Sequence, residues 1–96
     1  MALLSDADIQ ERLSGAGDWH ADGEGAIVRE LVLPDFAAAV AFLDRVAVLA
    51  EAANHHPDML LHGWNKLRLT LSTHSDGGLT DADFQLAGQI DRLEPA

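Results

Sequence analysis

The chain carries two short segments whose side chains could move protons at neutral pH. The first is Glu51-Ala-Ala-Asn-His-His-Pro-Asp58, in which a carboxylate precedes two adjacent histidines. The second is Thr73-His-Ser-Asp-Gly-Gly78, which contains a further histidine. Imidazole changes its charge near neutral pH, so a positioned histidine can serve as a general acid or a general base. The candidate residues for such chemistry are His55, His56 and His74; the alternative is that they are ordinary surface or core histidines.

The two adjacent histidines are expected to play different roles. Successive side chains of an extended backbone point to opposite sides, so His55 and His56 cannot both face one substrate in the same way. A metal site is the competing use, since His62, His74 and Glu51 could supply further ligands. The spacing of helical zinc motifs, two histidines four residues apart, is absent. We therefore predict that no metal is bound.

The composition limits the possible partners. The 96 residues, of which 48% are apolar, suit one globular domain spanning residues 1–96. Cysteine is absent, which removes disulfides and thiolate chemistry and is compatible with a cytoplasmic location. The net charge of −10, without a cluster of Lys and Arg, argues against nucleic acid as a partner. No apolar run is long enough for a membrane span, and a secretory signal is not expected, so we predict no membrane partner.

The first half of the sequence predicts a helix, two strands and a long second helix. Ser5 can cap a helix that ends near residue 14, where two glycines follow. Residues 18–22 and 26–33 predict strands, which are separated by a glycine turn. Asp35 caps the central helix, which runs to about residue 53 before Asn54 and a proline end it.

The second half predicts a hairpin and a final helix. Residues 59–64 and 66–73 predict two strands joined by a short link, with every second leucine from Leu67 on the buried face. Thr80 and Asp83 cap the last helix, and the proline near the C-terminus ends it. The order α-β-β-α-β-β-α predicts an α+β fold, in which one antiparallel sheet carries the helices on a single face.

The central helix and one tryptophan allow two readings each. Fifteen of the eighteen residues at positions 36–53 are apolar, and such a helix is usually buried on more than one side. This favours an oligomer formed partly on that helix, although its many alanines would also tolerate exposure. Trp64 is either a core residue or, at a strand end beside the histidines, a surface on which a flat heterocycle could stack.

The spacing of these residues resembles the signature of the pterin-4a-carbinolamine dehydratases. That signature runs here through Glu51, His55-His56-Pro57, Trp64, His74 and Asp83. The resemblance extends from about residue 13 to residue 90 and includes Asp35-Phe36, Trp19 and Gly78-Leu-Thr-Asp-Ala-Asp83.

The resemblance implies a fold, a reaction and partners. The fold is a four-stranded antiparallel sheet with three helices on one side, in a homodimer or homotetramer. The reaction is the removal of water from 4a-hydroxytetrahydrobiopterin, the pterin-4a-carbinolamine, to give quinonoid dihydropterin. It requires neither a metal nor an organic cofactor. It recycles the pterin of aromatic amino acid hydroxylases, which would be functional partners of this chain.

The resemblance also implies roles for individual residues. His55 and His74 are expected to be the catalytic acid–base pair, in either assignment, and Glu51 is expected to support His55. Asp83 matches the signature, although its simplest role is to cap the last helix. The residues expected to bind the substrate or shape its pocket are His56, Pro57, Trp64 and Asp83.

Two other functions fit the same resemblance. Some members of the family serve as dimerisation cofactors of a homeodomain transcription factor. A protein-binding module of that kind would act through a helix surface rather than through the histidines. The second alternative is a domain that binds a pterin and regulates a partner without turnover.

Overall fold

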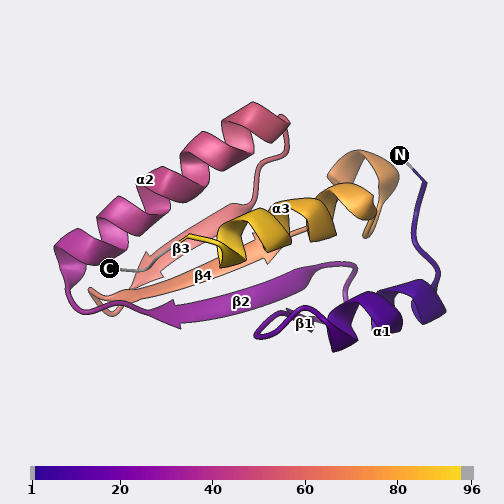
Figure 1. Cartoon of the computed structure of the whole chain (residues 1–96), viewed down its shortest axis with the longest axis horizontal. Helices are drawn as coiled ribbons and strands as arrows, with labels where there is room; N and C mark the ends of the chain where they lie inside the picture. The colour runs from indigo at the N-terminus through magenta and orange to yellow at the C-terminus, as the bar shows by residue number, and fades with distance from the viewer. Residues whose placement is uncertain (1, 94–96) are drawn as a thin grey trace.

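A computed structural model describes residues 2–93 and shows one sheet with the helices on one of its faces (Figure 1). The helices are α1 (Asp6–Ser14), α2 (Phe36–Ala53) and α3 (Asp81–Asp91). The strands are β1 (His20–Ala21), β2 (Ile27–Val32), β3 (Asp58–His62) and β4 (Lys66–Leu71), and a 3-10 turn, η1, covers His74–Asp76. The sheet has the order β1-β2-β4-β3, and all neighbouring strands are antiparallel. The predicted α-β-β-α-β-β-α order and the α+β fold class are confirmed.

The hydrophobic core lies between the sheet and the helices. On β4 the side chains of Leu67, Leu69 and Leu71 are fully buried, as the alternation predicted, while the residues between them face the other side. Helix α2 contributes Phe42 and α3 contributes Ile90 to the same cluster. The core therefore lies on one face of the sheet, and the other face carries no helix (Figure 1).

The helix boundaries follow from local capping chemistry. Ser5, Asp35 and Thr80 each accept a hydrogen bond from a backbone N–H of the first turn of the helix that follows. Asn54 ends α2 in the left-handed conformation, with φ 49° and ψ 42°, as its sequence position predicted. The proline expected to end the last helix, Pro95, lies outside the described residues.

The β3–β4 hairpin determines which residues can meet. Its turn contains Gly63 and Trp64, both at positive φ (54° and 59°), and the Trp64 side chain is 60% exposed. The turn has three residues, Gly63, Trp64 and Asn65, because His62 pairs with Lys66 across the ladder. Because the strands are antiparallel, the residues before β3 and after β4 lie at one end of the hairpin. The turn lies at the other end.

Helix α2 buries only one side in the single chain. Ala39, Phe42, Val46 and Ala50 face the core. On the outward side Val48 is 69% exposed, and Phe36 in the first turn is also exposed. The chain therefore presents an apolar helix surface, and its covering by a second copy remains a prediction.

No helix among residues 2–93 is long and apolar enough to cross a membrane.

Candidate active site

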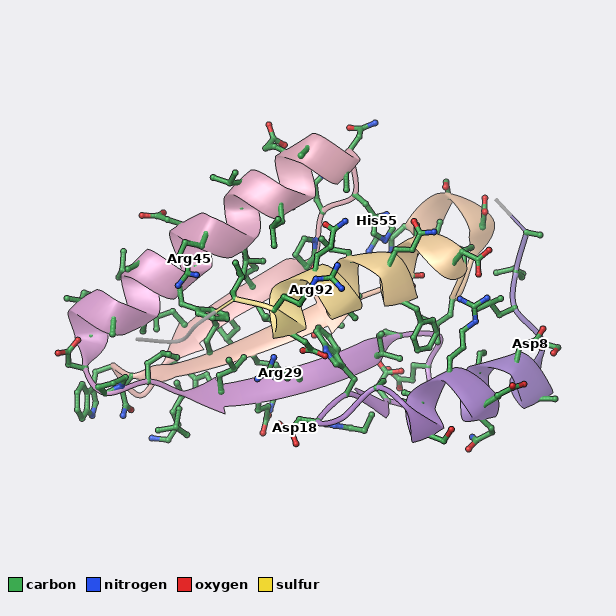
Figure 2. The ribbon with its side chains drawn as sticks, in the orientation of Figure 1. Asp8, Asp18, Arg29, Arg45, His55 and Arg92 are labelled. Carbon is green, nitrogen blue, oxygen red and sulfur yellow. The ribbon has the colours of Figure 1, made fainter. Side chains whose placement is uncertain are left out.

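The end of α2 delivers His55 to the first turn of α3. After Asn54 reverses the chain, the His55 backbone N–H donates to the Ala50 carbonyl at 3.1 Å. Its ring nitrogen Nε2 lies 2.5 Å from Asp83 Oδ1, and the two side chains are 15% and 0% exposed. Figure 2 shows His55 between the end of α2 and α3. A buried carboxylate therefore orients this imidazole.

Asp83 does two things at once. Its Oδ2 atom accepts hydrogen bonds from the Thr80 backbone N–H at 3.0 Å and from the Thr73 hydroxyl at 2.8 Å. The first of these bonds completes the capping box with Thr80, as the sequence predicted. The contact of Oδ1 with His55 was not predicted, because the two residues are distant in sequence.

The Asp83 contact has a chemical consequence for His55. An ionised carboxylate can only accept hydrogen bonds, so the Nε2 atom that faces it carries a proton. In the neutral ring the second nitrogen, Nδ1, is then the basic one. A carboxylate beside the ring also stabilises the imidazolium that forms when Nδ1 takes up a proton. The arrangement suits a general base.

The expected support of His55 by Glu51 is wrong. The Glu51 carboxylate contacts Nε2 of His56 instead, and both side chains are largely exposed. A continuing helix would have stacked Glu51 and His55, four residues apart, on one face. The helix ends at Ala53, and the left-handed Asn54 turns the chain. Because of that turn, His56 rather than His55 lies beside Glu51.

His74 opens the 3-10 turn that follows β4, and it borders a hollow of about 340 Å³. Thr73 and Gly78 close this turn as a β-bridge. Because Thr70 and Ser72 alternate with the buried leucines, the hollow lies over the helix-free face of the sheet. Its lining residues are Asp22, Glu24, Ala26, Asp58, Thr70, Ser72, His74 and Gly77.

Asp58 lines the hollow, although the sequence predicted no role for it. Asp58 begins β3, directly after half-buried Pro57, and its partner across the ladder is Thr70. Its place within the signature segment was the available signal. Three carboxylates, from Asp22, Glu24 and Asp58, make the hollow acidic, which suits a ligand rich in N–H donors.

Trp64 does not lie beside the histidines within one chain. It occupies the turn of the hairpin. His56, before β3, and His74, after β4, both lie at the other end of the hairpin. Strand β3 alone, five residues long, separates the two ends by about 16 Å at roughly 3.3 Å per residue. The reading that placed Trp64 beside the histidines is wrong for the single chain, and so is the reading of Trp64 as a core residue, because it is 60% exposed.

No cluster suitable for a metal is found in the part of the chain that the structure describes. There, no three His, Asp or Glu side chains are grouped so that they could hold an ion. His62, one of the ligands considered from the sequence, is exposed on β3. The side chains that do meet form pairs, His55 with Asp83 and His56 with Glu51.

Comparison with known proteins agrees with this fold. Residues 2–93 match the family described as "Pterin 4 alpha carbinolamine dehydratase". The chain belongs to that family. A relative from Chloroflexus aggregans is 48% identical over 93 residues, covering 97% of this chain and 98% of its own. One from Roseiflexus castenholzii is 51% identical over 92 residues, covering 96% and 97%. Both are named "Putative pterin-4-alpha-carbinolamine dehydratase".

Two solved structures share the fold. A protein from Brucella melitensis, titled transcriptional coactivator/pterin dehydratase, superimposes with a TM-score of 0.88 at 32% identity, covering 94% of this chain and 96% of its own. A pterin dehydratase-like protein identified as a RuBisCO assembly factor in the alpha-carboxysome gives a TM-score of 0.65 at 25% identity, covering 77% and 86%. The same fold thus occurs in a protein described as a pterin dehydratase and in one described as an assembly factor.

Proposed function

We propose that this chain is a lyase that removes water from a 4a-hydroxytetrahydropterin and releases the quinonoid dihydropterin. A base takes the proton of the ring nitrogen next to the hydroxyl-bearing carbon, and an acid protonates the departing hydroxyl. The carbon–oxygen bond breaks, a carbon–nitrogen double bond forms, and one water leaves. Each positioned proton transfer of this kind is worth about 10²–10⁴-fold in rate.

The observation that carries the proposal is the contact between His55 and buried Asp83. It makes Nδ1 of His55 the basic nitrogen and stabilises the ring once it is charged. His74, at the hollow, is the second proton-transfer residue. The carboxylates of the hollow would accept hydrogen bonds from the N–H groups of the pterin's aminopyrimidine ring.

Most of the other residues predicted for the site are proposed to bind or orient the substrate rather than to transfer protons. His56, with Glu51 beside it, and Pro57 lie next to His55 in the chain and are proposed to bind or orient the substrate. Trp64 is not assigned a substrate contact within one chain. The reaction would recycle the pterin of an aromatic amino acid hydroxylase in the cytoplasm.

The test is dehydration of a 4a-hydroxytetrahydropterin generated in situ, with the uncatalysed rate subtracted. We expect acceleration by the wild type and its loss in His55→Ala and His74→Ala. His62→Ala is the matched control, because this histidine is exposed on β3 and outside the site. A folded wild type without acceleration, or equal losses in all three variants, would count against the proposal.

A protein-binding role is the second candidate. The outward side of α2 exposes Val48, Phe36 is exposed in its first turn, and two structural relatives are described as a coactivator and as an assembly factor. We propose that this side of α2 is covered by a second copy in a dimer or tetramer, or by another protein. Val48→Asp should lower the mass measured by analytical ultracentrifugation. An unchanged mass would show that Val48 is not in an interface between copies.

A further inference from the structure

A short chain of buried hydroxyl groups holds the far side of the Asp83 carboxylate. The Thr73 hydroxyl lies 2.8 Å from Asp83 Oδ2 and 2.8 Å from the Thr80 hydroxyl. A hydroxyl has one proton, and an ionised carboxylate has none to donate. Thr73 therefore donates to Asp83, and Thr80 donates to Thr73. All three residues are buried, so water does not compete for these bonds.

The backbone of Thr73 also holds the turn that presents His74. Its N–H donates to the Gly78 carbonyl at 2.9 Å. Its carbonyl accepts from the N–H groups of Asp76 and Gly77 at 3.0 Å each, and from that of Gly78 at 3.3 Å. His74, the next residue, begins this turn. Thr73 is thus linked by hydrogen bonds to the surroundings of both candidate proton-transfer residues. Its hydroxyl reaches His55 through Asp83, and its backbone holds the turn that begins with His74.

We propose that Thr73 is a positioning residue, whose hydroxyl holds Asp83 so that His55 and the His74 turn keep a fixed relative placement. The inference rests on the proposed function for its effect on rate, but the geometry can be tested without turnover. Without the Thr73 hydroxyl, Asp83 Oδ2 loses one of its two donors. Asp83 can then rotate, and its contact with His55 loosens.

The test compares Thr73→Val, which removes the hydroxyl at nearly constant shape, with Thr73→Ser, which keeps it. We expect Thr73→Val to lower kcat by about tenfold or more with little change in KM, because small misplacements of catalytic groups cost up to about a hundredfold. Thr73→Ser should stay close to the wild type. Val46→Ala, which opens the core on α2 away from this network, is the control for lost stability.

The second readout is the nitrogen-15 spectrum of the histidine rings. The His55 Nε2–H signal, identified by its loss in His55→Gln, should be sharp in the wild type and in Thr73→Ser. In Thr73→Val it should broaden through exchange with water, and the amide signals of residues 74–78 should shift. These changes report the placement of His55 and of the turn directly.

The outcomes separate this inference from the proposed function. Thr73→Val and Thr73→Ser with equal rates and equal spectra would overturn it, as would a loss of rate in Val46→Ala as large as that in Thr73→Val. If the folded wild type shows no dehydration, the proposed function fails. The ring signal then decides alone: its loss only in Thr73→Val supports the positioning role, and its retention overturns that role.

Discussion

Replacing Asp83 by Asn should abolish the dehydration activity without unfolding the protein. The amide oxygen can still accept from the Thr80 N–H and the Thr73 hydroxyl, which are the two donors to Oδ2. The amide NH₂ then faces His55 where Oδ1 stood. Because an NH₂ group donates, Nε2 of His55 must accept, and its proton moves to Nδ1. The ring keeps its place but loses its basic nitrogen at Nδ1.

The expected magnitude follows from this change. Loss of a general base costs about 10²–10⁴-fold in kcat, which corresponds to about 3–5 kcal/mol of barrier at about 1.4 kcal/mol per tenfold. The stability cost is smaller, about 1–3 kcal/mol for weakening a buried, charge-assisted hydrogen-bond set. Small domains have about 5–15 kcal/mol of unfolding free energy. The variant should therefore remain folded while its activity is lost.

The assay pairs initial dehydration rates with urea unfolding of the same preparations. Asp81→Asn is the matched control, since Asp81 lies in the same helical turn but is half exposed and pairs with Arg12 at the surface. It should retain its rate. A folded Asp83→Asn variant with the wild-type rate would refute the assignment of His55 as a base held by Asp83.

Three further predictions use the same measurements. Leu69→Ala, at a fully buried β4 position, should lower the unfolding free energy by about 2–5 kcal/mol; an unchanged urea midpoint would contradict the burial of this residue. Glu51→Gln should change kcat/KM by less than about fivefold, because its contact with His56 is largely exposed and even an exposed ion pair contributes only about 0.2–1 kcal/mol; a hundredfold loss would mean that Glu51 acts on the substrate. The rate should depend on pH between about 5.5 and 8, because imidazole general acids and bases change their charge near neutral pH; a flat profile over this range would argue against imidazole catalysis.

The elements of the fold could be predicted because each depends on residues close in sequence. The caps at Ser5, Asp35 and Thr80 act within one helical turn, and Asn54 ends α2 through its own backbone conformation. The leucine alternation of β4 determines its buried face in the same local way. Boundaries moved by a few residues, as for the first strand, which pairs only at His20–Ala21.

The placement of Trp64 shows how two local expectations can conflict. The sequence predicted a hairpin with its turn near this residue, and one of the two readings of Trp64 placed it beside the histidines. Both cannot hold in one chain, because antiparallel strands carry the turn and their outer ends to opposite ends of the hairpin. The hairpin is confirmed, and the reading that placed Trp64 beside the histidines is wrong for the single chain.

The sequence by itself determined the residue types of the site, their order and the family to which the chain belongs. Only the tertiary structure decided which side chains meet. Asp83 reaches His55 because α3 packs against α2, and His56 rather than His55 meets Glu51 because the chain turns at Asn54. Capping and alternation are local and can be read from neighbouring residues. A contact between residues 28 positions apart depends on how the helices pack, which short-range sequence patterns do not specify.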